Sequence, residues 1–201
     1  MKVLFLTNNN ITAPLVDWLR ADGADVPLTG DMLTVEMVKD HSPAWIVSYN
    51  YRHIIKSDVL DLCPARILNF HVSLLPWNRG ADPNLWSFLE DTPKGVTIHL
   101  MDKGVDTGPI LLSKELQFEA KTETLQTSYA RLQEEIQSLF KENWAQIKRG
   151  GISPRPQPAG GSRHFTRDSE KFKQIVGEEL FKLNCLEIKQ KYAEYSNSLK
   201  R

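Results

Sequence analysis

Apolar and polar positions alternate along the first 150 residues in a pattern that predicts strands and helices in turn. Val3-Leu4-Phe5-Leu6 is a continuous apolar run, which is typical of a strand covered on both faces within a parallel sheet. The polar turn Asn8-Asn9-Asn10 leads from it into an amphipathic segment that carries Leu15, Val16, Trp18 and Leu19. The same alternation continues with expected strands at 24–28 and 45–48 and expected helices at 34–40 and 52–62. This order predicts a doubly wound α/β sheet.

The second half of the chain continues this pattern and then loses it. We expect a loop over 73–83, a short helix over 84–90, strands over 96–101 and 110–118, and a long helix over 122–148 that ends at Gly150-Gly151. Residues 151–167 hold three prolines and four basic side chains without periodicity, which predicts an extended arm. A tail from 168 to 201 carries an apolar stripe that predicts one or two amphipathic helices. We therefore expect a domain over 1–150, and an arm and tail over 151–201 that pack on the domain or on a partner subunit.

Composition narrows the classes of function. The chain has 201 residues, with 41% hydrophobic and 25% charged, which is the profile of one soluble globular domain. Its 25 basic and 25 acidic residues leave no net field to attract a nucleic acid. No apolar run approaches the roughly 18 residues that span a bilayer, and the amino-terminal run is too short for a secretory signal, so we expect a cytoplasmic protein. Cys63 and Cys185 lack metal or disulfide spacing and are expected to be free thiols, with no metal bound.

Two segments carry residues that suit acyl transfer. The segment 65–71 alternates with period two, so Asn69 and His71 project from one face while Leu68 and Phe70 point the other way. Asp106 follows the next expected strand. An amide or a protonated imidazole can donate to an oxygen that becomes negative, and a carboxylate can orient the imidazole and take up a proton from an attacking amine. Since each segment ends an expected strand, the three groups can meet over one reacting carbon.

Each of these residues also has a simpler interpretation. A single strand histidine such as His71 often bonds a backbone carbonyl, and His99 is more often structural than a proton carrier. Asp106 can be a turn carboxylate that bonds its own backbone, and the nearby Asp102 is expected to be a loop or structural acid. The presence of Asn69, His71 and Asp106 within two long motifs favours the catalytic interpretation.

These motifs are Asn69-Phe70-His71-Val72-Ser73-Leu74-Leu75-Pro76 and Asp102-Lys103-Gly104-Val105-Asp106-Thr107-Gly108. In them the chain resembles the folate-dependent formyltransferases, which include glycinamide ribonucleotide transformylase, methionyl-tRNA formyltransferase and nucleotide-sugar N-formyltransferases. The resemblance implies a Rossmann-like sheet of the formyltransferase type with a helical carboxy-terminal extension. It also implies that Asn69, His71 and Asp106 are the catalytic residues and that 10-formyltetrahydrofolate is the formyl donor.

The resemblance further places the folate beside residues 49–54 and 100–105. The side chains expected there are Tyr51, Arg52, Ile54, Met101, Lys103 and Val105. The alternative for Tyr51, Ile54 and Ile55 is that they face the core.

The amine acceptor is less constrained by the sequence. The loop 77–86 is rich in donors and aromatic side chains, which suits an acceptor with phosphates, sugar hydroxyls or a base. The turn 8–10 lacks the glycines that would cradle a ribonucleotide phosphate, and the 50 residues after the domain are too few for the β-barrel of the tRNA enzymes. We therefore expect a nucleotide-linked amino sugar. Residues expected to bind it are Asn10, Ser73, Trp77, Asn78 and Arg79.

Three alternatives remain open at this point. The chain could formylate glycinamide ribonucleotide or methionyl-tRNA, it could hydrolyse formyltetrahydrofolate, or it could bind folate without chemistry. Because sugar formyltransferases are frequently dimers and the tail has an apolar stripe, we also expect a homodimer.

Overall fold

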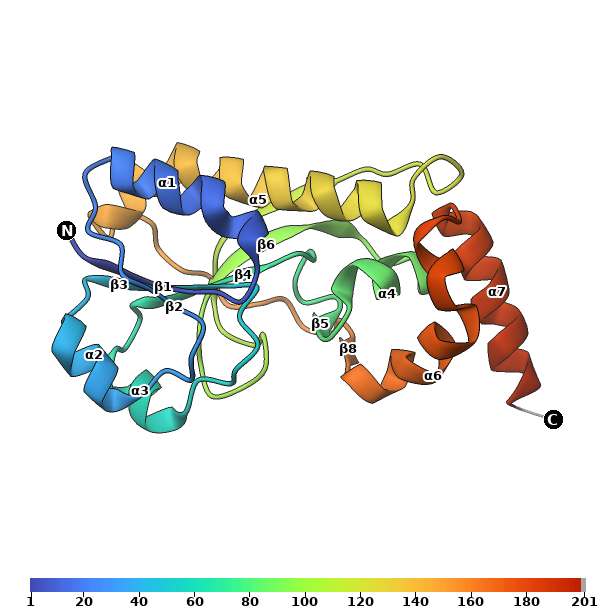
Figure 1. Cartoon of the computed structure of the whole chain (residues 1–201), viewed down its shortest axis with the longest axis horizontal. Helices are drawn as coiled ribbons and strands as arrows, with labels where there is room; N and C mark the ends of the chain where they lie inside the picture. The colour runs from blue at the N-terminus through green and yellow to red at the C-terminus, as the bar shows by residue number, and fades with distance from the viewer. Residues whose placement is uncertain (200–201) are drawn as a thin grey trace. The chain divides into compact units, whose positions relative to one another are not determined.

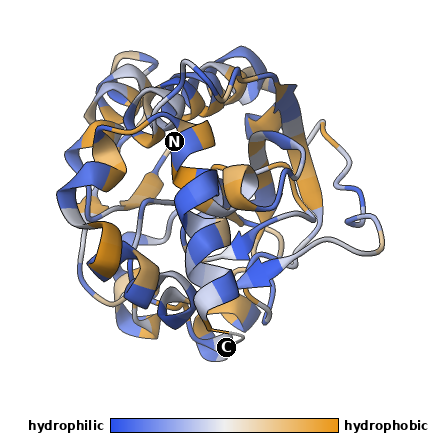
Figure 2. Ribbon diagram, turned by 90° about the vertical axis from the view of Figure 1, so that its right-hand side faces the viewer, coloured by the Kyte–Doolittle hydropathy of each residue, from blue (hydrophilic) through white to orange (hydrophobic). Residues whose placement is uncertain are grey.

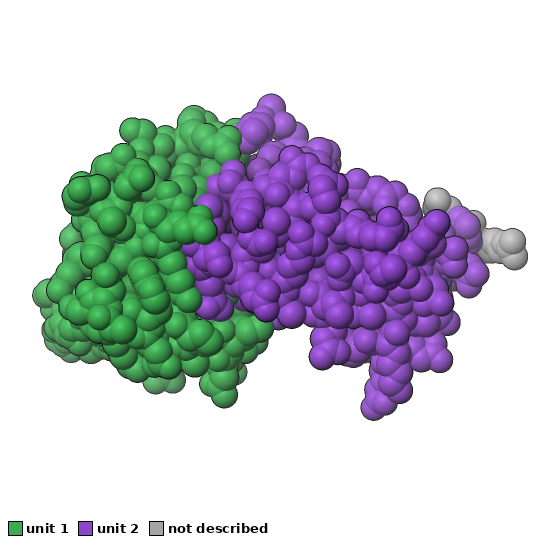
Figure 3. Space-filling model, turned by 90° about the horizontal axis from the view of Figure 1, so that it is seen from above, with its two compact units in different colours: residues 1–71, 98–112, 140–157 green, residues 72–97, 113–139, 158–201 purple. Residues whose placement is uncertain are grey.

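The computed structural model describes residues 1–199, which form two compact units, coloured separately in Figure 3. Unit 1 comprises Met1–His71, Ile98–Leu112 and Phe140–Gln157, and unit 2 comprises the remaining described residues. In chain order the elements are β1 (Val3–Leu6), η1 (Asn10–Thr12), α1 (Ala13–Ala21), β2 (Leu28–Thr29), α2 (Val35–His41), β3 (Trp45–Tyr49), α3 (Ser57–Leu62), β4 (Ile67–His71), β5 (Arg79–Gly80), α4 (Pro83–Leu89), β6 (Lys94–Leu100), β7 (Ile110–Leu116), α5 (Leu125–Lys148), β8 (Arg163–His164), α6 (Thr166–Val176), η2 (Gly177–Phe181) and α7 (Cys185–Ser198).

Unit 1 is built on a sheet with the strand order β2-β1-β3-β4-β6-β7, to which β6 and β7 contribute their residues 98–100 and 110–112. Strands β1, β3 and β4 pair in parallel, with Leu4 opposite Ile46 and Ile46 opposite Ile67. Helix α1 and the end of α5 cover one face, and α2 and α3 cover the other (Figure 1). The doubly wound, mostly parallel sheet expected from the alternating pattern is therefore confirmed.

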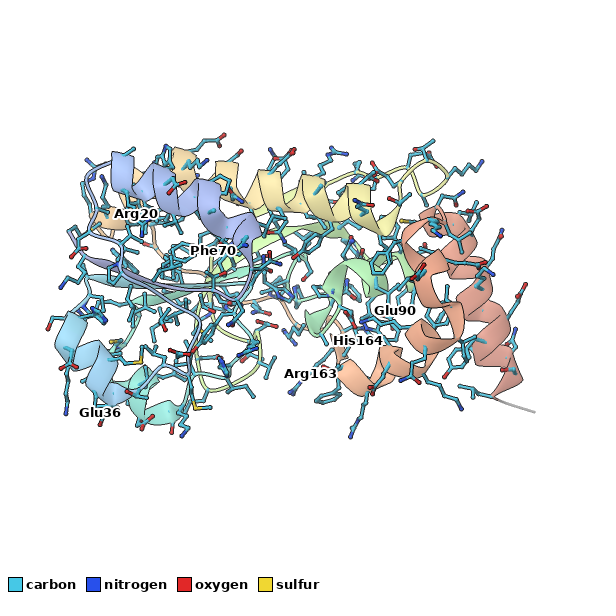
Figure 4. The ribbon with its side chains drawn as sticks, in the orientation of Figure 1. Arg20, Glu36, Phe70, Glu90, Arg163 and His164 are labelled. Atoms are coloured by element: carbon cyan, nitrogen blue, oxygen red, sulfur yellow. The ribbon has the colours of Figure 1, made fainter. Side chains whose placement is uncertain are left out.

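The two faces of this sheet have different cores. On the α1 and α5 side, a row of rings runs from Tyr49 to Phe70 at 4.9 Å, from Phe70 to Phe140 at 5.1 Å and from Phe140 to Trp144 at 4.9 Å (Phe70 is labelled in Figure 4). On the other side, Ile67 joins the aliphatic cluster that packs against α2 and α3. Since side chains alternate along a strand, Asn69 shares the face of Ile67 and points away from the aromatic row.

Two helices begin later than their sequence patterns predict. Helix α3 begins at Ser57 rather than near residue 52, because the Arg52 N–H donates to the Asn8 side chain at 3.0 Å and not to a helical carbonyl. Helix α5 begins at Leu125, since the Thr122 N–H already closes a turn on Glu119 at 3.0 Å. In both cases a side chain or a turn holds the backbone before the helix.

Unit 2 contains α4, α6, η2, α7 and the two-stranded sheet of β5 and β8. Its core joins α4 residues such as Trp86 to Phe172, Leu180 and Ile188 of the tail. The predicted amphipathic helices of the tail are thus present, and Figure 2 shows the mixed hydropathy of the helices. Cys185 is a free thiol in this core, and burial is the main cause that raises its pKa to about 12. Over residues 1–199, no helix combines the length and the apolarity that crossing a membrane requires.

Phe140→Ala is expected to lower the free energy of unfolding by about 3 to 5 kcal/mol, because it leaves a cavity between Phe70 and Trp144. Phe140 is fully buried, whereas Glu142 on the same helix is exposed and gives the control Glu142→Ala. Urea unfolding followed by tryptophan fluorescence measures both variants. Equal losses of stability in the two variants would contradict the packing described for this face.

Candidate active site

Asn69, His71 and Asp106 meet at the carboxyl end of β4. The Asn69 Nδ2 donates to Asp106 Oδ1 at 3.0 Å, and His71 Nδ1 lies 3.6 Å from Asp106 Oδ2. The second distance suits an ion pair but is longer than a hydrogen bond. The His71 and Asp106 side chains are only 8% and 12% exposed, so water screens this interaction weakly. One carboxylate therefore holds both side chains that project from β4.

His99 of β6 completes this polar cluster. Its Nδ1 lies 2.9 Å from the Leu100 carbonyl, while its Nε2 lies 3.1 Å from Asn69 Nδ2 and 3.4 Å from Asp106 Oδ1. A carbonyl oxygen can only accept, so the contact with Leu100 places a proton on Nδ1, and in the neutral ring Nε2 is then the acceptor for the Asn69 amide. Both N–H groups of Asn69 are then directed, one to His99 and one to Asp106.

The loop that carries Asp106 is held from several directions. Asp106 itself has φ 53°, in the left-handed region that aspartate tolerates better than most residues. Gly108 has no room for a side chain, since a Cβ there would overlap the Leu100 carbonyl oxygen. Asp102 accepts from the Gly104 N–H at 3.0 Å and from the Thr107 hydroxyl at 2.6 Å, which confirms it as a loop acid. These contacts fix the direction in which the Asp106 carboxylate points.

Gln157 clamps the same loop from the arm. Its Nε2 donates to the carbonyls of Asp106 at 2.8 Å and of Gly108 at 2.9 Å. Nothing in the sequence pointed to this residue, because it lies in an aperiodic segment 51 positions beyond Asp106. The sequence places His99 on an expected strand. It does not reveal the contact of His99 with Asn69, because that contact depends on how β6 lies relative to β4.

The residues expected to contact folate all lie in unit 1, in two different settings. Tyr51 is tied to the fold, since its hydroxyl donates to the Asp31 carbonyl at 2.5 Å and burial raises its pKa. Met101 packs against the aliphatic core, and Lys103 pairs with Asp61 at 3.3 Å. By contrast Ile54 is 80% exposed and Val105 is 37% exposed, while the neighbouring Ile55 is buried. The side chain of Arg52 is exposed and donates to His53.

The residues expected to contact the acceptor differ strongly in exposure. Asn10 is exposed at the start of η1 in unit 1. In unit 2, Ser73 is buried and donates to the Trp77 carbonyl at 2.7 Å. Asn78 is fully buried and bonds Thr92 at 2.7 Å and Ser162 at 3.1 Å. Trp77 and Arg79 are partly exposed. Ser73 and Asn78 therefore hold the loop, and Trp77 and Arg79 present side chains at its surface.

Comparison with known proteins connects this geometry to a family. A family model described as formyl transferase matches residues 24–143. The formyltransferase PseJ from Anoxybacillus kamchatkensis, solved with UDP-4,6-dideoxy-4-formamido-L-AltNAc and tetrahydrofolate, is 40% identical. The match covers 94% of this chain and 97% of PseJ, with a TM-score of 0.85. A sugar N-formyltransferase from a Shewanella species shares the fold at 22% identity and a TM-score of 0.75, over 85% of this chain and 79% of its own.

A methionyl-tRNA formyltransferase from Pelobacter propionicus is 35% identical over 124 residues. That alignment covers 61% of this chain but only 39% of the length of the tRNA enzyme.

The contacts of His99 predict its tautomer. A long-range proton–nitrogen correlation spectrum of protein labelled at histidine nitrogens should show the His99 proton on Nδ1 and a bare Nε2, because the Leu100 carbonyl requires a donor. Comparison with the spectrum of His99→Gln assigns the signal. A bare Nδ1 with the proton on Nε2 would contradict the proposed orientation of the Asn69 amide.

Proposed function

Because the chain belongs to the formyl transferase family, we propose that it moves a formyl group from 10-formyltetrahydrofolate to a primary amine at Asn69, His71 and Asp106. The observation that supports this most is that Asn69 and His71 both approach the Asp106 carboxylate, with the Asn69 Nδ2 at 3.0 Å and the His71 Nδ1 at 3.6 Å from its oxygens. Amine attack makes the formyl oxygen negative and the amine nitrogen positive. The cluster provides a partner for each charge.

His71 and Asp106 divide this work. In its protonated form His71 carries a proton on each ring nitrogen, so that with Nδ1 directed at Asp106 its Nε2 donates to the formyl oxygen. Such a donor in a site shielded from water contributes about 3 to 4 kcal/mol. Asp106 takes the proton that the attacking amine loses, directly or through a water molecule. The carbonyl re-forms as the bond from the formyl carbon to N10 of the folate breaks, and N10 takes up this proton to leave as tetrahydrofolate. His99 positions the Asn69 amide.

Asn69 can act as a second donor only if one of its two existing bonds is exchanged. We propose that Asn69 gives up its hydrogen bond to Asp106. A carboxylate that has taken up a proton is a weaker acceptor, whereas His99 still accepts from its fixed place on β6. Proton uptake by Asp106 then releases an Asn69 N–H for the oxygen that carries the negative charge.

The folate is the source of the formyl group, and two features of unit 1 suit a bound pterin ring. Ile54 and Val105 expose aliphatic surface on the two segments where the ring is expected. Met101, partly buried beside the core, adds a side chain that adapts to an aromatic face. These residues would bind and orient the ring and exclude water from the reacting groups.

The acceptor is a nucleotide-linked amino sugar in this proposal. Similarity to PseJ over nearly the whole length of both chains supports it, since PseJ was solved with a UDP-linked formamido sugar. Similarity to the methionyl-tRNA enzyme supports formyl transfer itself, but it extends over the smaller part of that protein. The balance of 25 basic and 25 acidic residues also gives little attraction for tRNA.

Replacing a member of the cluster tests the chemistry. Asn69→Ala, His71→Ala and Asp106→Asn are each expected to lower kcat/KM for formyl transfer by at least about a hundredfold, because each removes a partner of a charge that develops in the reaction. Asparagine at position 106 keeps a residue that tolerates φ 53°. His41→Ala, at the end of α2, is the control. Near-normal turnover in any two of the three variants would refute the assignment.

Replacing Arg79 tests the acceptor class. Arg79→Ala is expected to raise KM for the sugar nucleotide by about ten to a hundred and fifty fold, the effect of losing a charge-assisted hydrogen bond, with little change in KM for the folate. Steady-state kinetics with each substrate varied in turn measure this, and Arg66→Ala at an exposed site is the control. Efficient formylation of methionyl-tRNA or glycinamide ribonucleotide, without activity on amino-sugar nucleotides, would refute the proposed acceptor class. The catalytic roles proposed for Asn69, His71 and Asp106 would still stand.

A further inference from the structure

Strands β5 and β8 place two arginines side by side in unit 2. Arg79 and Arg163 are paired in parallel register, and the ladder is closed by bonds of 3.0 Å from the Arg79 N–H to the Ser162 carbonyl and from the Ala81 N–H to the His164 carbonyl. The strands approach closely at Gly80, where a Cβ would overlap the His164 carbonyl oxygen. Paired residues of neighbouring strands point to the same face, and like charges in this position repel. Such a pair is stabilised by an anion that both side chains share.

The strand that carries Arg163 is firmly anchored. His164 is buried, stacks on Trp86 at 4.0 Å with an interplanar angle of 7°, and lies 3.2 Å from Glu90 (Figure 4). Ser162 donates to the buried Asn78 at 3.1 Å. Since neighbours on a strand point to opposite faces, the anchored His164 directs Arg163 to the other face, where it is exposed.

Phe165 restricts the motion of the Arg163 side chain. Its ring is 46% exposed, and the guanidinium carbons of Arg163 and Arg167 lie 4.7 Å and 5.1 Å from its centre. A guanidinium that already rests on a ring loses less conformational freedom when it binds a ligand. This arrangement accounts for a large exposed aromatic side chain at the end of β8.

The carboxylates near this surface have other partners. Glu90 interacts with His164, and Asp168 accepts from the Phe165 N–H at 2.7 Å and lies 3.8 Å from Arg167. Within residues 1–199, no carboxylate forms an ion pair with Arg163. The positive charge of Arg163 is therefore not neutralised by an acidic side chain of the described chain.

We propose that Arg79 and Arg163 together bind the diphosphate of the nucleotide-linked acceptor. The planar fork of a guanidinium matches phosphate oxygens, and two forks on neighbouring strands can hold the two phosphates of one diphosphate. This inference rests on the proposed acceptor class and adds Arg163 to it, a residue of the arm in which the sequence showed no functional signal.

Titration calorimetry with UDP on the whole chain tests the proposal. Arg163→Gln is expected to weaken UDP binding by about ten to a hundred and fifty fold, because it removes charge-assisted bonds to phosphate. Arg131→Gln is the matched control, since Arg131 lies 4.8 Å over the ring of Phe118 in the same unit and should bind UDP like the wild type. KM for the folate should be unchanged in both variants, which also shows that they are folded.

A double-mutant cycle tests whether the two arginines share one ligand. Arg79→Gln and Arg163→Gln combined should weaken UDP binding by less than the product of their separate effects. Wild-type affinity for UDP in Arg163→Gln, in an enzyme that formylates a UDP-linked amino sugar, would overturn this inference and leave the proposed function standing. A wild-type enzyme that transfers formyl groups yet binds neither UDP nor dTDP would overturn both this site and the acceptor class.

Discussion

The hydrogen bond from the Asn69 amide to the Asp106 carboxylate, at 3.0 Å, is the interaction on which the candidate active site depends. It joins the end of a buried parallel strand to a loop whose other contacts already direct the Asp106 carboxylate toward that strand. The bond forms only if β4 presents Asn69 and His71 on one face and the loop points Asp106 back at them. The aromatic row on the opposite face, the tight approach at Gly108 and the clamp of Gln157 all serve these two conditions.

A carboxylate in this setting can serve two purposes in turn. In the structure it orients an amide and an imidazole, and in the proposed reaction it accepts a proton from the amine. These purposes are compatible because His99, bonded to its own strand, keeps hold of the Asn69 amide when Asp106 changes its charge. In the proposed reaction, proton uptake by Asp106 is thus coupled to the release of an Asn69 N–H as a donor.

Much of this arrangement was accessible from the sequence, for local physical reasons. Period-two alternation places Asn69 and His71 on one face, and apolar runs separated by amphipathic segments predict the doubly wound sheet. The start of α3, the bond between His99 and Asn69, and the clamp of Gln157 were not accessible, because each depends on segments that are distant in the chain. The pairing of Arg79 with Arg163 is of the same kind. It appears only when the aperiodic arm returns to form a parallel strand beside β5.

Transfer of a labelled formyl group tests the central claim most directly. The enzyme would be given 10-formyltetrahydrofolate with carbon-13 in the formyl group, with and without a UDP-linked amino sugar, and the label followed by carbon NMR. Our account predicts that the label appears as a formamide on the sugar, in step with the formation of tetrahydrofolate, and that it stays on the folate when the amine is left out. Release of labelled formate at the same rate with and without the amine would contradict it, because the cluster would then activate water rather than an amine.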